Sequence, residues 1–382
     1  MLLVDLVKNE KRRVIVRSVN ILIKPSSSHC NLRCSYCFYF DETSHRDVTS
    51  YGYMSSETMD AIIDKALNCA TERCEFGFQG GEPMLSGLKW YQRFVERVRE
   101  SNIHNIDVQY SIQTNGILIT EEWAQFFSKH GFLVGVSLDG PSKYHNRYRV
   151  DKHGDGSFRY VMNGIDILKK YNVDFNILTV VTARTARNIK EIYKFFMEKN
   201  LPNQQYIPCL DPLSTSGQAR NNALSVPMYA RFLKDLFDVW YEDRRAGVMV
   251  YNRYFENLAG LILGLVPESC NMRGTCSIQY AIEADGSVFP CDFYMLDAYL
   301  LGNINKNSLQ EIDLVRTSHR FIERSSILAE KCHQCRWFAL CRGGCYRERV
   351  IAEPNKVPLN RYCEAYQEFF AYAVPRLQLL LK

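Results

Sequence analysis

Residues 29–39 read HCNLRCSYCFY and contain three cysteines in the order C-x3-C-x2-C, at Cys30, Cys34 and Cys37. Thiolates are soft ligands that suit zinc and iron–sulfur clusters. A structural zinc and a four-iron cluster both usually take four protein ligands, so a set of three leaves one metal position open. A substrate or cofactor can bind at an open position, and the incomplete set therefore indicates chemistry. The alternative is a zinc site completed by His29 or His45.

Length and charge limit the classes of protein that this chain can belong to. Its 382 residues suffice for about two or three domains, or for one large barrel with an appendage. The formal net charge is +5, with no basic block beyond Lys11-Arg12-Arg13, so charge gives no indication of nucleic-acid binding. The first residues lack a secretory apolar region, and no stretch approaches the roughly 18 apolar residues of a membrane span. We therefore expect a cytoplasmic protein with no membrane or nucleic-acid partner.

Strand-like and helix-like segments alternate up to residue 209. Apolar runs predict strands at 20–24, 74–79, 107–113, 132–138, 173–181 and 204–209, and amphipathic stretches predict helices at 56–70, 87–100, 121–130, 157–171 and 185–200. The alternation predicts a parallel α/β sheet with right-handed crossovers, as an open doubly wound sheet or an open barrel. Polar and glycine-rich motifs follow the strands, among them Gly80-Gly81-Glu82-Pro83. Such folds carry their sites at the carboxyl ends of the strands.

The pattern changes after residue 226. We expect a helix from Pro227 to about Ala246, a hairpin over 281–294 with Asp285-Gly286 at its turn, and a final helix at about 360–381. Of the 14 cysteines, eight lie after residue 269. The chain is therefore divided into an N-terminal extension (1–18), a barrel (19–240) and a cysteine-rich domain with a C-terminal helix (241–382).

The cysteine loop, with Tyr36 before its last cysteine and GGEP after the second strand, resembles the radical S-adenosylmethionine (SAM) superfamily. The resemblance implies an open (β/α)6 partial TIM barrel. In it, Cys30, Cys34 and Cys37 would ligate three irons of a [4Fe–4S] cluster, and S-adenosylmethionine would chelate the fourth. The residues implied in binding S-adenosylmethionine are Tyr36, Gly80, Gly81, Glu82, Gln113 and Ser137. For the polar residues at strand ends, ordinary turn formation is the alternative.

The eight downstream cysteines can hold two four-thiolate sites, and two structural zincs are the physical alternative. Their spacing, C-x2-C-x5-C-x3-C with a distal cysteine, resembles the SPASM extension of peptide-modifying radical SAM enzymes. The resemblance implies two auxiliary [4Fe–4S] clusters and divides the ligands into Cys270, Cys276, Cys291 and Cys345 for the first cluster and Cys332, Cys335, Cys341 and Cys363 for the second. The interleaving of the two sets is taken from the family and does not follow from spacing.

The segments KPSSSHCNLRCSYCFY, FQGGEP, SIQTNG, VGVSLDGP, CLDPL and SVFPCDFY make most of the chain similar to the anaerobic sulfatase-maturating enzymes. This resemblance implies oxidation of a Ser or Cys, in a C/S-x-P-x-R motif of a sulfatase polypeptide, to Cα-formylglycine. A 5′-deoxyadenosyl radical would remove a hydrogen from Cβ. The implied cofactors are S-adenosylmethionine and three [4Fe–4S] clusters, and the implied electron donor is a ferredoxin- or flavodoxin-like protein.

Asp292 directly follows Cys291, and the resemblance assigns it the role of the base that takes the proton of the target side chain. Burial would raise its pKa and make it a better base, whereas turn capping or pairing with an arginine is the alternative. Tyr39 and Gln79 match family positions that line the substrate pocket. Two other functions stay open: another SPASM peptide modification, such as thioether or carbon–carbon cross-linking of a ribosomal peptide, and a zinc-binding scaffold protein.

Overall fold

The fold is built on one curved sheet. The structure is a computed structural model, and it describes residues 16–213, 224–350 and 357–381. The sheet has ten strands in the order β10-β9-β8-β1-β2-β3-β4-β5-β6-β7. Six of them are parallel neighbours in chain order: β1 (Val16–Ile23), β2 (Ala70–Phe78), β3 (Asp107–Thr114), β4 (Phe132–Ser137), β5 (Phe175–Val181) and β6 (Asn203–Pro208). This order confirms the open (β/α)6 barrel.

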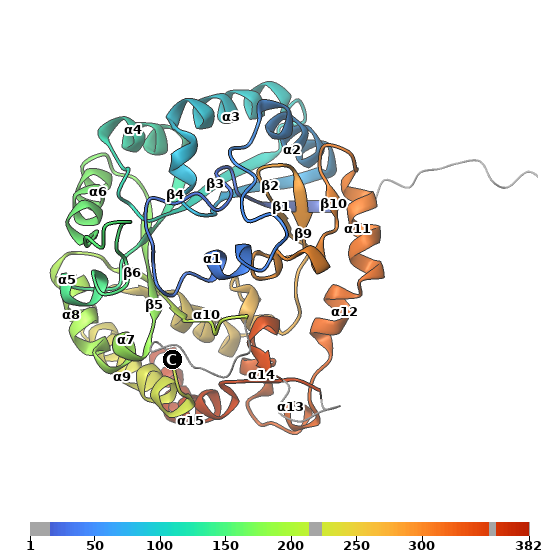
Figure 1. Cartoon of the computed structure of the whole chain (residues 1–382). Coiled ribbons are helices and arrows are strands. Elements are labelled where there is room, and N and C mark those ends of the chain that lie inside the picture. The colour runs from blue at the N-terminus through green and yellow to red at the C-terminus, as the bar shows by residue number, and fades with distance from the viewer. Residues whose placement is uncertain (1–15, 214–223, 351–356, 382) are drawn as a thin grey trace, which may run out of the picture.

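Helices cover the outside of this sheet, and Figure 1 shows them around the rim with the short helix α1 (Phe38–Thr43) inside the ring. The outer helices of the barrel are α2 (Ser56–Cys69), α3 (Leu88–Ser101), α4 (Glu121–His130), α6 (Phe158–Lys170), α7 (Ala183–Arg187) and α8 (Ile189–Glu198). Polar side chains cap several of them: Ser55 Oγ accepts the Thr58 N–H at 3.2 Å, and Thr120 Oγ1 accepts the Trp123 N–H at 3.5 Å. The single helix expected at 185–200 is wrong, because the chain breaks at Asn188 between α7 and α8.

The cysteine-rich region extends the same sheet. Strand β8 (Tyr280–Ile282) pairs in parallel with β1 and forms the predicted hairpin with β9 (Ser287–Phe289), where Gly286 adopts a φ of 89°. Two short strands complete the sheet: β10 (Gly302–Asn303) pairs with β9, and β7 (Tyr251–Asn252) pairs with β6. The hairpin brings the segment after β9, with Cys291 and Asp292, against the barrel.

The C-terminal helix also packs on the barrel. Helix α15 (Cys363–Leu380) lies against α9 (Val226–Arg245), with the rings of Phe237 and Phe369 5.9 Å apart and both fully buried. Cys363 therefore begins an anchored helix. The domain limits at 19–240 and 241–382 stay a prediction. The extension predicted at 1–18 lies mostly outside the described residues, and residues 16–18 belong to β1.

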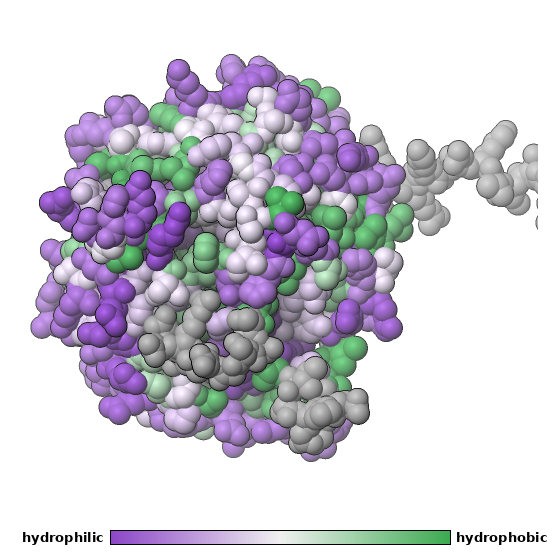
Figure 2. Space-filling view, in the orientation of Figure 1, coloured by the Kyte–Doolittle hydropathy of each residue, from purple (hydrophilic) through white to green (hydrophobic). Residues whose placement is uncertain are grey.

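Another short helix of the barrel, α5 (Ser142–His145), follows β4. Further helices lie in the cysteine-rich region. They are α10 (Arg253–Ile262), α11 (Leu309–Ser318), α12 (Phe321–Ser326), α13 (Glu330–His333) and α14 (Phe338–Cys341). None of the described helices combines the length and apolar composition of a membrane span. Figure 2 shows hydrophilic residues around the rim of the face seen in Figure 1, with paler and apolar residues towards its centre.

Candidate functional site

The three-cysteine loop follows β1 and brings its thiols together. Burial, with the charges of Glu82 and the neighbouring thiolates, raises the pKa of Cys30 to about 12. Backbone N–H groups point at two of the sulfurs: Leu32 donates to Cys30 Sγ at 3.3 Å, and Phe40 donates to Cys37 Sγ at 3.4 Å. Such N–H···S bonds stabilise a thiolate and tune the potential of iron–sulfur clusters. The donor set therefore fits a cluster bound by three cysteines.

The GGEP motif lies directly against this loop. The Gly81 N–H donates to the Ser27 carbonyl at 2.9 Å, and the Glu82 N–H donates to the His29 carbonyl at 2.7 Å. A Cβ atom on Gly81 would lie 2.0 Å from the His29 carbonyl oxygen, so no side chain fits there. Gly80 has a φ of +146°, which favours glycine. The motif is thus a close contact between two strand-end loops.

The Glu82 carboxylate is used inside the protein. It is fully buried and accepts hydrogen bonds from Thr114 Oγ1 (2.8 Å), Asn115 N (2.8 Å) and Met84 N (3.1 Å). Burial raises its pKa to about 7, although these bonds oppose the shift. The carboxylate joins the ends of β2 and β3 and is not free for the predicted contact with S-adenosylmethionine. The backbone carbonyl oxygen of Glu82 accepts the Ser26 hydroxyl at 2.8 Å and has a second lone pair for that contact.

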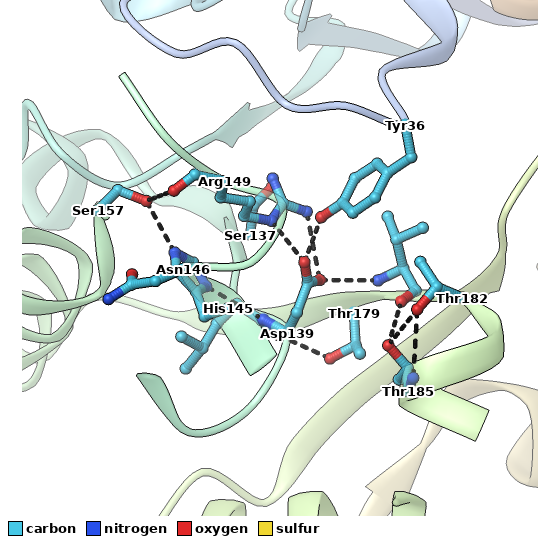
Figure 3. Close-up of polar contacts among 12 residues, drawn as sticks. Tyr36, Ser137, Asp139, His145, Asn146, Arg149, Ser157, Thr179, Thr182 and Thr185 are labelled. Atoms are coloured by element: carbon cyan, nitrogen blue, oxygen red, sulfur yellow. Dashed lines mark hydrogen bonds and ion pairs between the residues drawn. The ribbon is translucent and has the colours of Figure 1, made fainter. Parts of the chain in front are cut away.

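Gln113 and Ser137, the other predicted strand-end contacts, lie together, since Gln113 Nε2 donates to Ser137 Oγ at 3.1 Å. Next to them, the Tyr36 hydroxyl donates to buried Asp139, as Figure 3 shows. Arg149 Nε also donates to Asp139, at 3.0 Å. Burial raises the pKa of the Cys34 thiol to about 11 and the Arg149 charge opposes it, so the guanidinium lies close to a cluster cysteine. Sequence reasoning missed Arg149, which belongs to no recognisable motif.

Asp292 lies where the barrel meets the cysteine-rich region. Lys24 Nζ donates to one of its oxygens, and Gln79 Nε2 donates to the other at 3.0 Å. The Lys24 ammonium also lies 4.3 Å from the centre of the Tyr39 ring. The structure therefore brings the three predicted residues Asp292, Gln79 and Tyr39 to one place. Asp292 is 14% exposed and pairs with a lysine that the sequence analysis missed, not with an arginine.

Lys24 had a detectable signal, because it is a charged residue at the end of the apolar strand β1, which points to the functional edge of the sheet. Behind it, the Tyr39 hydroxyl donates to Glu283, and Arg46 Nη1 donates to the same carboxylate at 2.9 Å. All three of these side chains are buried. Tyr39 thus reaches the site through its ring, and its hydroxyl is held by Glu283.

Glu42 carries a buried carboxylate without a hydrogen bond among the described residues of this region. It is 2% exposed, and neither of its oxygens has a hydrogen-bond partner within the described part of the chain. Burial, together with the negative charge of Asp292, raises its pKa to about 8. No sequence pattern points to Glu42, since its burial depends on α1 lying inside the ring.

The eight downstream cysteines form two groups. Burial chiefly raises the pKa of Cys345 to about 12, and the nearby Cys270 and Cys276 thiols contribute. Burial likewise raises the pKa of Cys291, again with contributions from Cys345 and Cys270. The structure thus brings together the first set that the family resemblance predicted.

The second group lines one cavity together with apolar side chains of α14 and α15. Its four thiols are those of Cys332, Cys335, Cys341 and Cys363. Within the described ranges, no three His, Cys, Asp or Glu side chains converge on a point where one metal ion would bind. In a four-iron cluster each thiolate bonds a different iron, so its ligands lie further apart than those of a single ion. The sulfur-only sets fit clusters.

Comparison with known proteins agrees with this geometry. Residues 25–196 match the model of the radical SAM superfamily, and residues 270–336 match that of SPASM, an iron-sulfur cluster-binding domain. The SPASM match overlaps the region that carries both downstream cysteine groups. The comparison therefore gives no support to a zinc-binding scaffold protein.

Whole-chain relatives are similar across almost the entire length. The chain is 47% identical to the cysteine-type anaerobic sulfatase-maturating enzyme of Clostridium perfringens (strain 13 / Type A), over 94% of this chain and 97% of that protein. It is 29% identical to the serine-type enzyme of Bacteroides thetaiotaomicron, over 95% of this chain and 91% of that protein. A solved structure, native anSMEcpe with bound AdoMet and Cp18Cys peptide, is similar at a TM-score of 0.89 and 46% identity, covering 95% and 98% of the two chains. The chain therefore belongs to the anaerobic sulfatase-maturating enzymes, within the radical SAM superfamily and with a SPASM domain.

Proposed function

We propose that this enzyme oxidises a cysteine of a sulfatase polypeptide to Cα-formylglycine. The observation that carries the proposal is the position of Asp292, which adjoins Cys291 in the sequence and is held from the barrel side by Lys24 and Gln79. A carboxylate placed there can take a proton beside a redox centre. Identity favours cysteine over serine as the target, since the chain is 47% identical to a cysteine-type relative and 29% identical to a serine-type one.

The cofactors follow from the family and from the three sulfur sets. When bound, S-adenosylmethionine and its cluster supply the 5′-deoxyadenosyl radical, and the auxiliary clusters supply electron acceptors. We assign the first cluster to Cys30, Cys34 and Cys37, and the two auxiliary clusters to the two downstream groups. Tyr36, Gly80, Gly81, Glu82, Gln113 and Ser137 are the proposed contacts of S-adenosylmethionine.

The chain's own residues then handle the proton. Conversion of a cysteine side chain to a thioaldehyde removes one hydrogen atom from Cβ, one proton from sulfur and one electron, and water then releases hydrogen sulfide and leaves the aldehyde. Asp292 accepts the sulfur proton, while the Lys24 ammonium and the Gln79 amide fix the direction of its carboxylate. The Tyr39 ring, against Lys24, forms one wall of this part of the site.

Two protein partners belong to the proposal. The substrate is a sulfatase polypeptide with a C-x-P-x-R type motif, and the electron donor is a ferredoxin- or flavodoxin-like protein. A cytoplasmic location stays a prediction from the sequence, consistent with the reducing conditions under which the fourteen cysteines form no disulfide.

The test uses reconstituted, reduced enzyme with S-adenosylmethionine and a matched pair of peptides that carry cysteine or serine in the motif. We expect a loss of about 18 Da from the cysteine peptide, with hydrogen sulfide released, as the mass balance of this reaction class requires. A thioaldehyde before hydrolysis and a cross-link are both about 2 Da lighter, so the product is kept in water before it is weighed. A loss of about 2 Da that persists, with neither hydrogen sulfide nor an aldehyde formed, would indicate cross-linking and contradict the proposal. The Asp292→Asn variant is expected to form 5′-deoxyadenosine without formylglycine.

A further inference from the structure

Arg349 is a buried cation in the short strand β11 (Arg349–Val350), which pairs with β12 (Leu359–Asn360). Its guanidinium makes five hydrogen bonds, one for each N–H donor that the group has. The acceptors, at 2.5–3.3 Å, are the backbone carbonyl oxygens of Gly274, Ser325, Ile327, Gly343 and Gly344. One side chain thus holds three separate segments of backbone.

Those segments carry ligands of both auxiliary sets. Gly274 lies between Cys270 and Cys276 of the first set, and Ser325 and Ile327 lead into Cys332 of the second. The Ser325 hydroxyl oxygen also accepts the Cys276 N–H at 2.9 Å, which ties these two segments together.

The third segment, Gly343-Gly344, separates Cys341 of the second set from Cys345 of the first. Gly343 packs closely on the guanidinium, since a Cβ atom there would lie 3.3 Å from Arg349 Nη2. Displacement of Arg349 would therefore disturb the point at which the two sets interleave.

The positive charge of Arg349 is buried between the loops of both sets. No carboxylate forms an ion pair with it in the described ranges 16–213, 224–350 and 357–381. The backbone carbonyls that Arg349 bonds belong to the loops of Cys276 and of Cys332, so one cysteine loop of each set lies against the guanidinium. A buried cation without a carboxylate is costly unless other anions compensate it. The cysteine thiolates of the two loops are the anions that can compensate the charge of Arg349.

We propose that Arg349 is a positioning residue shared by the two auxiliary clusters: it anchors the loops of both ligand sets and is the counter-cation of both clusters. Because a nearby positive charge stabilises the more negative, reduced form of a cluster, Arg349 raises both reduction potentials. This inference rests on the ligand assignment under the proposed function.

The test uses the full chain with Cys30→Ala, Cys34→Ala and Cys37→Ala, so that all remaining cluster iron is auxiliary. This parent is compared with versions that also carry Arg349→Lys, Arg349→Gln or, as a matched control, Arg316→Gln. Arg316 is a buried arginine of α11 paired with Asp313, and it bonds none of the cysteine loops. Iron content, midpoint potentials by electron paramagnetic resonance titration, and circular dichroism are measured for each.

We expect about eight irons in the parent and in the Arg316→Gln control, for two clusters of four. Arg349→Lys keeps the charge but has fewer donors, and both midpoint potentials should shift together. Arg349→Gln should lose more than half of the iron, or shift both potentials downward. If Arg349→Gln loses its folded circular dichroism signal, the joint shift in Arg349→Lys decides the outcome.

The proposal is overturned if only one cluster responds to the Arg349 variants, or if neither does while the parent holds both clusters. A parent that loads no auxiliary iron instead overturns the ligand assignment itself. The two failures are therefore distinguishable.

Discussion

At the scale of single residues, two buried glutamates of the barrel show opposite use of a carboxylate. Glu82 accepts three hydrogen bonds and joins two strand ends. Glu42 is equally buried and accepts none from the residues that the structure describes. An unpaired buried carboxylate costs more than a paired one, so Glu42 should lower stability whenever it is ionised.

Stability should therefore depend on pH through Glu42. Its pKa rises from 4.5 in an exposed setting to about 8 in the folded protein. The folded state binds more protons between these values, so the contribution of Glu42 to stability is lost as the pH rises through this window. Glu42→Gln has no such group. As the pH rises through the window, the free energy of unfolding of the variant should therefore increase relative to that of the parent, by up to about 1.4 kcal/mol per pH unit.

Anaerobic unfolding of parent and Glu42→Gln holoenzyme at about pH 5.5 and about pH 8 checks this expectation, since the window set by linkage lies between the two pKa values. A difference in the free energy of unfolding between parent and Glu42→Gln that stays constant with pH would contradict it. Glu82→Gln is the comparison, because an amide in place of that carboxylate turns one N–H donor towards the groups that now donate to Glu82. This variant should be destabilised at both pH values. The pKa of Glu82 is raised only to about 7, so its own pH window closes below that of Glu42.

Lys24 is the residue on which the direction of the Asp292 carboxylate depends. We expect Lys24→Met to lower formylglycine formation roughly ten- to a hundred-fold, about 1.4–2.7 kcal/mol, because Asp292 loses its ammonium partner. Formation of 5′-deoxyadenosine should persist, since in the proposed reaction the proton is removed after the hydrogen atom. Lys65→Met is the control, as Lys65 bonds the Asn307 carbonyl at 2.8 Å, away from the site. Equal loss of both products would show that Lys24 acts earlier.

At the scale of elements, local pattern predicted most of the barrel. The six parallel strands follow from apolar runs, and α4 runs over Glu121–His130, the range expected from the sequence. The strands β7 and β10, two residues each, are too short to give a periodic signal. The break at Asn188 was also missed, because the helical sequence pattern continues on both sides of it. In the structure, Asn188 Nδ2 bonds the Arg184 carbonyl at 2.8 Å at this break.

The GGEP loop gives a prediction at this scale. Gly81→Ala would place a Cβ atom 2.0 Å from the His29 carbonyl oxygen and push the motif away from the three-cysteine loop. We expect a loss of about 2–4 kcal/mol of stability, in the range of severe steric changes, and loss of S-adenosylmethionine binding in equilibrium dialysis. Gly260→Ala in α10 is the matched control, because its nearest outside atom would be 3.7 Å away. Unchanged binding in Gly81→Ala would argue against a role for this contact.

At the scale of the whole molecule, the site depends on contacts that no local pattern predicts. Lys24 and Asp292 are 268 residues apart in sequence. They meet because β8 pairs with β1 and carries the hairpin of the cysteine-rich region into the barrel sheet. The family resemblance pointed to Asp292, Gln79 and Tyr39, and a charge at the end of an apolar strand was the only signal for Lys24. Arg46, Glu283 and Arg349 needed the assembled fold, since the partners of each lie in distant segments.

This shared sheet predicts that the barrel does not fold by itself. A fragment of residues 19–240 would lose β8 from the edge of β1 and α15 from the apolar face of α9, where Phe237 packs on Phe369. An exposed strand edge and an exposed apolar face both favour aggregation. We expect the fragment to elute as aggregate in size-exclusion chromatography, and co-expression with residues 241–382 to restore a defined complex. A monomeric fragment that unfolds cooperatively would instead make residues 19–240 an independent domain.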